Sequence, residues 1–222
     1  QKHDSVERFC RLGAKVEFGD TEFIDEHALS LSGKSISARN WVIATGSSAL
    51  VPPIEGLDKT TYLTNREIFY LDRLPASLIV LGAGPIAAEM AQAFCRLGSQ
   101  VTVIQRSGQI LSKEDRDMAE IVKQELEKEG VAFQMNAAVV RVGDLGRERE
   151  VVIKNEAGEL RTLKAEALLV ALGRSPNVAG LGLEKIDIPF DHQVIKVNSH
   201  LRTSHRHIYA AGDVIGGYQF TH

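Results

Sequence analysis

Apolar residues follow two different periods along the stretch from Ser77 to Arg106. Residues 78–81 form an uninterrupted apolar run, which is typical of a parallel strand buried on both faces. From Pro85 to Leu97 the apolar residues recur at helical spacing, and Gly98 is suited to end that helix. Residues 101–104 then form a second apolar run. The stretch therefore predicts a complete strand, helix and strand unit.

Weaker patterns predict the elements on either side of this unit. A short helix is expected at 5–12, a second at 64–71, and a long one at 112–129. The long helix should bury a stripe formed by Met118, Ile121, Val122 and Leu126. The expected strands cover residues 15–23, 28–31, 41–44, 132–135, 138–142, 150–154, 160–163, 167–172, 194–197 and 208–211. The strands before residue 64 are too few for a sheet with its own core, so we expect them to complete a domain with other segments.

A glycine-rich turn joins the first strand of the central unit to its helix. The segment Gly82-Ala83-Gly84-Pro85-Ile86-Ala87 fits the pattern G-x-G-x-x-A. In this pattern the first glycine allows a tight turn, the second lets the backbone approach a pyrophosphate, and the alanine keeps the helix close to the sheet. Proline suits the first helical turn, where its missing N–H removes no hydrogen bond. The turn predicts a dinucleotide site, and a phosphate-free structural turn is the alternative.

Composition excludes several other functions. The 222 residues carry a net charge of −3, which gives no electrostatic case for binding nucleic acid or an anionic membrane. No apolar run approaches the length of a membrane span, so a cytoplasmic location is expected. The two cysteines, Cys10 and Cys95, have neither a metal-binding nor a redox spacing.

Four motifs in one order resemble the pyridine nucleotide–disulfide oxidoreductases. They lie at residues 44–47 (ATGS), 82–89 (GAGPIAAE), 171–177 (ALGRSPN) and 209–213 (YAAGD). The resemblance implies an α/β fold in which a Rossmann-like NAD(P)-binding domain, with a parallel sheet and an antiparallel β-meander, is inserted in a partial FAD-binding domain. The expected boundaries are 1–68 and 186–222 for the FAD-binding parts and 69–185 for the NAD(P)-binding domain.

The resemblance also implies roles for individual residues. Asp213 would accept hydrogen bonds from the flavin ribityl chain, or would cap a helix. Glu89 would pair with a lysine beside the flavin, or would be a surface carboxylate, and Val139 would border the nucleotide, or would be a core residue. The full set implied to contact FAD is Thr45, Gly46, Ser47, Gly212 and Asp213, and the set implied to contact NAD(P)H is Gly82, Ala83, Gly84, Pro85, Ile86, Ala87, Glu89, Gln105, Arg106, Val139, Gly173 and Arg174.

The choice between NADH and NADPH depends on the end of the second strand. An NAD enzyme commonly has an acidic residue there, which repels a 2′-phosphate. Here the position holds Gln105, followed by Arg106, and the resemblance places an arginine of NADPH-dependent relatives at this point. A second arginine of those relatives falls at Ser112, so the phosphate clamp is incomplete unless Lys113 replaces it. We expect NADPH to be favoured over NADH.

The chemistry implied by the resemblance needs groups that these residues do not contain. It uses two cysteines four residues apart beside the flavin and an acid–base pair, so no catalytic residue and no metal ligand is predicted here. We expect a fragment of an FAD-dependent NAD(P)H oxidoreductase that reduces a small molecule, a disulfide or a metal ion. We expect the full-length protein to be homodimeric and this chain alone to be inactive. The alternatives are a flavoprotein of the NADH oxidase or ferredoxin reductase type, without a redox disulfide, and a non-catalytic nucleotide-binding module.

Overall fold

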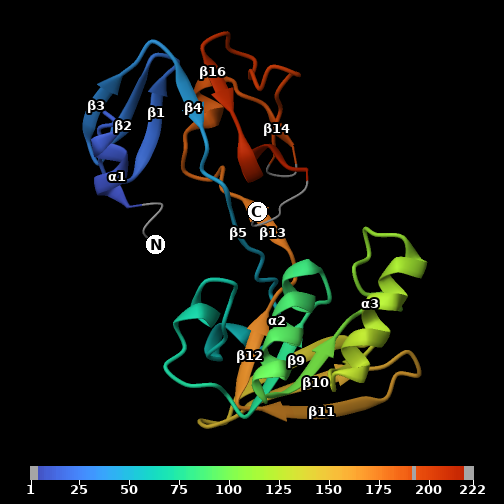
Figure 1. Cartoon of the computed structure of the whole chain (residues 1–222). Coiled ribbons are helices and arrows are strands. Elements are labelled where there is room, and N and C mark those ends of the chain that lie inside the picture. The colour runs from blue at the N-terminus through green and yellow to red at the C-terminus, as the bar shows by residue number, and fades with distance from the viewer. Residues whose placement is uncertain (1–4, 192–193, 218–222) are drawn as a thin grey trace. The chain divides into compact units, whose positions relative to one another are not determined.

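The computed structural model describes residues 5–191 and 194–217, which form two compact units (Figure 1). The first unit combines Gln1–Ser48 with Ser175–His222, and the second comprises Ala49–Arg174. These limits differ from the expected boundaries at 68/69 and 185/186. Leu57 belongs to a hydrophobic core of the second unit, and Leu183 belongs to the core of the first. The resemblance had placed Leu57 in the FAD-binding part (1–68) and Leu183 in the NAD(P)-binding domain (69–185).

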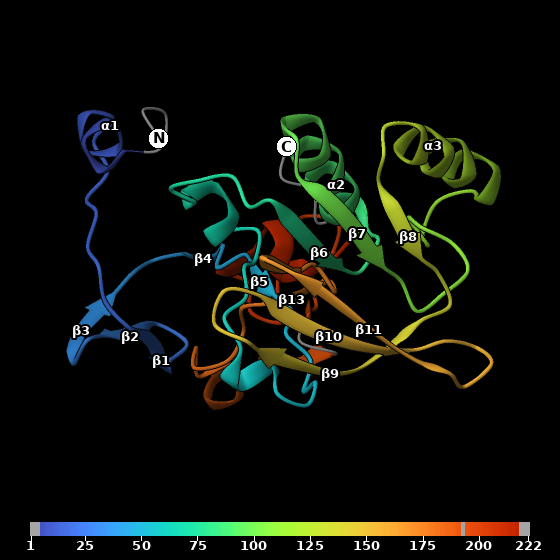
Figure 2. The ribbon, with the colours of Figure 1, turned by 90° about the horizontal axis from the view of Figure 1, so that it is seen from below.

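A four-stranded parallel sheet forms the centre of the second unit. Its strands β6 (Ser77–Leu81), β7 (Gln100–Ile104), β8 (Ala132–Gln134) and β12 (Ala167–Val170) run in the order β12-β6-β7-β8. Helices α2 (Pro85–Leu97) and α3 (Arg116–Lys128) cover one face of this sheet, as Figure 2 shows. The antiparallel meander of β9 (Ala138–Asp144), β10 (Arg149–Lys154) and β11 (Leu160–Ala165) covers the other. The predicted Rossmann-like α/β class is confirmed.

Strand β6 is apolar throughout because both of its faces are buried. Leu78 and Val80 pack with the helices, and Ile79 and Leu81 pack with the meander. Each of these four side chains is at most 1% exposed. Side chains of a strand alternate between its faces, so a sheet covered on both sides leaves no position for a polar residue. The predicted strand, helix and strand unit is present from Ser77 to Ile104.

Helix α3 is shorter than expected and buries a different line of residues. It begins at Arg116 rather than at 112, since Asp115 has a non-helical backbone (φ −58°, ψ 134°) and is the N-cap of the helix. Of the expected stripe only Leu126 is buried, together with Ala119; Met118 and Ile121 are each 60% exposed and Val122 is 38% exposed. The stripe prediction is therefore wrong for three of its four residues. The helix rests on the sheet along the narrow line of Ala119 and Leu126.

The first unit has a core to which both of its chain segments contribute. Phe23 and Ile43 from the early segment pack with Leu183, Ile208 and Val214 from the late one. The early strands thus obtain their core from residues that follow the second unit in the chain. Its elements are α1 (Val6–Arg11), the antiparallel strands β1 (Thr21–Asp25), β2 (Ala28–Leu31) and β3 (Lys34–Ser37), the parallel pair β4 (Trp41–Ile43) and β16 (Ile208–Ala210), the hairpin β14 (Phe190–Asp191) and β15 (Val194–Ile195), and the 3₁₀ helices η3 (Leu183–Ile186) and η4 (Gly212–Ile215).

Several smaller elements differ from the expectation. The strand expected at 15–23 begins only at Thr21, strand β3 was not predicted, and the helix expected at 64–71 is the 3₁₀ helix η2 (Glu67–Tyr70). A further 3₁₀ helix, η1, spans Leu57–Lys59. Strands β5 (Ser47–Ala49) and β13 (Arg174–Pro176), which pair with each other, were not predicted. Among the described residues, no helix is long and apolar enough to cross a membrane.

Candidate functional site

The two glycines of the turn after β6 have different reasons to be glycine. Gly82 has φ 96°, and a β-carbon at this position would overlap the carbonyl oxygen of Ala171 and lie 3.0 Å from its carbonyl carbon. The fold itself therefore requires Gly82. Gly84 has an ordinary backbone (φ −76°), and a β-carbon there would meet no atom within 4 Å. Packing does not explain Gly84, whose bare backbone faces open space.

Helix α2 starts at this open position with free hydrogen-bond donors. Gly84 is its N-cap and provides no side-chain cap, Pro85 is at the first turn, and that turn contains no acidic residue. The first N–H groups of a helix have no acceptor within it, and the helix dipole adds a partial positive charge. Ala87, fully buried, lets this end of the helix lie against the sheet. An anion is thus favoured beside Gly84, whereas Glu89 lies exposed about one turn further along the helix.

The segment that follows β7 carries Arg106, at the same carboxyl end of the parallel strands as the glycine turn. The Gln105 side chain is turned into its own loop, where Nε2 donates to Ser107 Oγ (2.8 Å) and to the carbonyl oxygen of Gln109 (3.1 Å). Arg106 is exposed and makes no hydrogen bond or ion pair within residues 5–191 and 194–217. Leu111 N donates to the Ala83 carbonyl oxygen (2.8 Å), which ties this loop to the glycine turn.

The remaining positions implied to contact NAD(P)H are more varied. Val139 is half-buried and packs against the hydrophobic core between the sheet and the meander. Gly173 is exposed with φ 119°, and its carbonyl oxygen accepts from Leu50 N (2.9 Å). Arg174 is half-buried at the start of β13. Ala83 is buried, and Ile86 is half-buried in the first turn of α2.

In the first unit, residues implied to contact FAD come together from distant parts of the chain. Ser47 Oγ donates to Asp213 Oδ2 over 2.5 Å. Asp213 lies in the first turn of η4, and the N-cap position of that helix is Ala211, so Asp213 is not the N-cap. Gly46 (φ 66°) and Gly212 (φ 78°) both have left-handed backbones, and no atom lies within 4 Å of a β-carbon built on either one. Space is open beside the backbone at both glycines.

Asn177 holds the loop at 45–48 and was given no role from the sequence. Its backbone N donates to the Gly46 carbonyl oxygen (2.9 Å), and its Nδ2 donates to the Thr45 carbonyl oxygen (2.9 Å). Its carbonyl oxygen accepts from Thr45 Oγ1 (2.7 Å), and its Oδ1 accepts from Ser48 Oγ (2.8 Å). All four polar groups of one residue are therefore used on this loop. Only its place at the end of the ALGRSPN motif marked it in the sequence.

Charged groups with shifted pKa values lie outside the predicted cofactor positions. The hydrogen bond from Arg73 is the largest cause that lowers the pKa of Glu166, and the hydrogen bond from Arg96 does the same for Glu129. These carboxylates hold segments of the second unit together. Within the described part of the chain, no group of three or more His, Cys, Asp or Glu side chains is arranged to hold a metal ion.

Together the parallel sheet, its covering helices and the glycine turn before α2 define a protein of the Rossmann-like α/β class. Residues 3–222 match the family model described as pyridine nucleotide-disulphide oxidoreductase. The chain is 34% identical to a mercuric reductase of Bacillus cereus, over 100% of the chain and 37% of the relative. It is 36% identical to a dihydrolipoyl dehydrogenase of Bacillus subtilis strain 168, over 94% of the chain and 46% of the relative.

A solved structure gives the same result. The HOCl-induced flavoprotein disulfide reductase RclA from Escherichia coli matches with a TM-score of 0.85 and 35% identity, over 93% of this chain and 47% of that one. The chain belongs to the pyridine nucleotide-disulphide oxidoreductase family. It spans less than half the length of each of these three relatives. The resemblance inferred from the four motifs is confirmed.

Proposed function

We propose that the second unit binds NAD(P)H and that the first unit forms part of an FAD-binding domain, in an oxidoreductase that passes electrons from the nicotinamide nucleotide through flavin to an acceptor. When bound, the nicotinamide nucleotide supplies a hydride and the flavin carries its two electrons onward. The acceptor would be a disulfide, a small molecule or a metal ion. The family, to which these relatives belong, supports this class of reaction.

The observation that carries the proposal is the contrast between Gly82 and Gly84. The fold accounts for Gly82, but nothing packed against Gly84 prevents a larger residue there. A backbone that is left bare beside the free N–H groups of α2 suits a pyrophosphate. In the proposed complex the N–H groups at the start of α2 donate to the pyrophosphate, Ala87 keeps the helix against the sheet, and Gly173 lets the backbone approach the nicotinamide end.

On the flavin side, the proposal gives Asp213 and the Thr45-Gly46-Ser47 loop the contacts to FAD. The hydrogen bond from Ser47 fixes the Asp213 carboxylate, and Asn177 fixes the loop. The positive φ angles of Gly46 and Gly212 keep side chains away from the space that a ligand would need.

For the nucleotide, we propose NADPH as the preferred donor. Arg106 is exposed at the end of β7 with no internal partner among the described residues, and an arginine can bind a 2′-phosphate through two donors. Gln105 carries no charge that would repel the phosphate. The second arginine of NADPH-dependent relatives is replaced here by Ser112, and the neighbouring Lys113 is exposed. We therefore propose Lys113 as the second cation for the 2′-phosphate.

Calorimetric titration of the chain with NADPH, NADH and FAD tests these proposals. Loss of one charge-assisted contact costs about 1.5–3 kcal/mol, so Arg106→Ala should raise the Kd for NADPH roughly 10- to 100-fold and leave that for NADH unchanged. Arg147→Ala is the matched control, because Arg147 is also an exposed arginine of the second unit. If Arg106→Ala binds NADPH and NADH with the same Kd values as the unchanged chain, the NADPH assignment is contradicted. If the unchanged chain binds neither nucleotide, the nucleotide site is contradicted.

A further inference from the structure

Five residues of the second unit line a pocket of about 650 Å³, and three of them are arginines. Arg73 lies in the segment that leads into β6, and Arg147 and Arg149 lie at the turn between β9 and β10. The lining is completed by Gly146 and by Glu166, which immediately precedes β12. Three segments that are distant in the sequence therefore bring three guanidinium groups to this arginine pocket.

The arginine pocket lies at the opposite edge of the parallel sheet from the glycine turn. Arg73 and Glu166 precede β6 and β12, so they lie at the amino ends of these strands, whereas Gly82 follows the carboxyl end of β6. The five residues of β6, at about 3.3 Å each, separate the two edges by roughly 15 Å. A ligand in the arginine pocket therefore does not occupy the position proposed for the nucleotide beside Gly84.

Glu166 offsets the charge of one of the three arginines. Its Oε1 accepts from Arg73 Nη2, and its Oε2 accepts from the backbone N of Ala76 (2.7 Å). The Glu166 side chain is 23% exposed, so this pair lies in the wall of the pocket. Nε and Nη1 of Arg73 make no hydrogen bond with the residues that the structure describes. Arg73 therefore keeps donors for a ligand although it is paired.

Arg149 is fixed in the wall of the pocket by backbone oxygens. Its Nη1 donates to the carbonyl oxygens of Gly146 (3.3 Å) and Glu166 (3.2 Å), and its Nε donates to that of Thr61 (3.2 Å). Nε also lies 3.7 Å from Asp144 Oδ2, and the Arg149 side chain is 16% exposed. Nη2 has no hydrogen bond to any described residue. The guanidinium group is therefore held in place with one of its nitrogens available.

Arg147 brings a guanidinium group that the described part of the chain does not use. The residue is exposed, and its side chain makes no hydrogen bond or ion pair with the described residues. Its neighbour Glu148 is exposed and does not line the pocket. Besides the pair of Arg73 and Glu166, the pocket thus carries two positive charges, and the Asp144 carboxylate lies 3.7 Å from one of them. An excess of positive charge remains for a ligand to offset.

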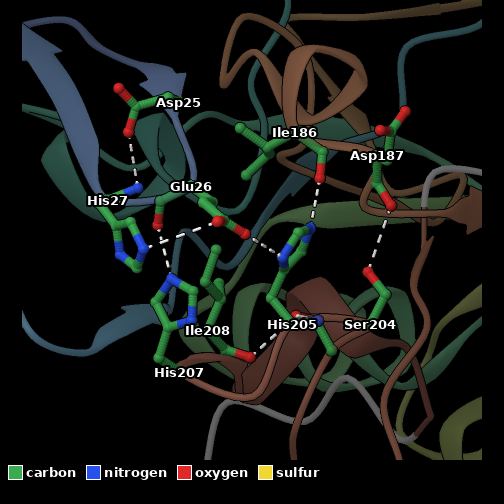
Figure 3. A network of polar contacts seen from close by, with 10 residues as sticks. Asp25, Glu26, His27, Ile186, Asp187, Ser204, His205, His207 and Ile208 are labelled. Atoms are coloured by element: carbon green, nitrogen blue, oxygen red, sulfur yellow. Dashed lines mark hydrogen bonds and ion pairs between the residues drawn. The ribbon is translucent and has the colours of Figure 1, made fainter.

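His27, His205 and His207 form another group of ionisable side chains, in the first unit, and the fold itself accounts for their contacts (Figure 3). His205 lies between Glu26 Oε2 (2.9 Å) and the carbonyl oxygen of Ile186 (2.5 Å). His207 Nε2 lies 2.7 Å from the carbonyl oxygen of Glu26, and the His207 ring stacks on His27. Because these nitrogens already face acceptors within the protein, we assign no ligand to the histidines.

We propose that the arginine pocket binds a phosphate group, either as the free ion or as a small phosphate ester. A phosphate ester has three strong acceptor oxygens and can accept from three guanidinium groups together, whereas a carboxylate has two oxygens. Arg147 and Nη2 of Arg149 donate to the phosphate, and Arg73 adds its unused donors. The bound phosphate joins the segment before β6 to the β9–β10 turn, and it thereby stabilises the second unit.

Phosphate binding can be followed residue by residue in NMR spectra of the full chain. The backbone N–H signal of Gly146 and the Nε–H signal of Arg149 report on the arginine pocket, and the backbone N–H signal of Ala87 reports on the glycine turn. Inorganic phosphate, glycerol 3-phosphate and acetate are titrated separately at constant ionic strength. The variants are Arg147→Ala and, as the matched control, Arg116→Ala, because Arg116 is an exposed arginine of the same unit at the start of α3.

In the unchanged chain, at least one of the two phosphates should shift the Gly146 and Arg149 signals to saturation. The one with the lower Kd identifies whether the pocket holds the free ion or an ester. Acetate should bind at least about tenfold more weakly. Arg147→Ala removes charge-assisted hydrogen bonds, so it should raise the Kd for phosphate roughly 10- to 100-fold, and Arg116→Ala should leave this Kd unchanged.

The proposal is overturned if neither phosphate saturates the Gly146 and Arg149 signals, or if acetate binds as tightly as phosphate. Equal Kd values for Arg147→Ala and Arg116→Ala would overturn it as well. Phosphate that shifts only the Ala87 signal belongs to the proposed nucleotide site, and this result would also count against the arginine pocket. The titration of the unchanged chain needs no variant to fold, and its outcome does not depend on whether the glycine turn binds NADPH.

Discussion

Replacing each glycine of the turn after β6 by alanine should produce opposite effects on stability and on ligand binding. In Gly82→Ala the new β-carbon overlaps the Ala171 carbonyl oxygen at φ 96°. A left-handed backbone costs an alanine about 1–2 kcal/mol, and overpacking costs about 1–3 kcal/mol. The second unit should therefore lose about 2–5 kcal/mol in its free energy of unfolding.

Gly84→Ala provides the comparison within the same turn. Its backbone is ordinary and its surroundings are open, so the loss should stay below about 1 kcal/mol, which is the usual effect at a helix N-cap. Its methyl group would, however, occupy the space proposed for the pyrophosphate. The affinity for NADPH should fall at least about tenfold although the fold is intact.

Urea unfolding followed by far-ultraviolet circular dichroism measures the stability of the second unit, since both long helices, α2 and α3, lie in it. Calorimetric titration measures nucleotide affinity. Equal loss of stability in the two variants would refute the distinction between the glycines. Unchanged NADPH affinity in a folded Gly84→Ala chain would refute the pyrophosphate site.

Three further predictions concern stability. Leu126→Ala should lower the free energy of unfolding of the second unit by about 2–5 kcal/mol, whereas Ile121→Ala, at a side chain 60% exposed, should change it by less than about 0.5 kcal/mol in the same urea experiment. Because the pKa of Glu166 is lowered from its usual value of 4.5, its contribution to the free energy of unfolding is present above about pH 4.5 and is lost as the pH falls through the lowered pKa. The difference in urea midpoint between Glu166→Gln and the unchanged chain should therefore shrink on acidification. A difference that stays constant would contradict this prediction. Asn177→Ala should increase amide hydrogen exchange at residues 45–48, while exchange across β6 is unchanged.

The central unit could be predicted because its signals are local. The apolar run at 78–81, the spacing of the two glycines and Gly98 all lie within a stretch of thirty residues, and each has a physical reason that does not depend on the rest of the chain. The strands and helix accordingly appear at the expected places.

Helix α3 shows where such local reasoning stops. Its apolar residues repeat correctly for an amphipathic helix, but the pattern cannot tell how wide a surface the neighbouring sheet will cover. Only Ala119 and Leu126 face that sheet closely, and Met118 and Ile121 remain in solvent. The role of Asn177 was hidden for another reason, because its partners lie 132 residues away from it in sequence at Thr45. No period or spacing encodes a contact over that distance.

The chain enters and leaves the second unit at neighbouring points, so this unit can be separated from the rest of the chain. Leu50 N donates to the Gly173 carbonyl oxygen over 2.9 Å, so the first and last residues of the unit are neighbours. A unit whose ends meet can be inserted into a loop of another protein, or removed from its own, without stretching either chain. Residues 49–174 can therefore be expressed as a separate protein. Such a protein retains every residue of the two hydrophobic cores that lie on the two faces of the parallel sheet.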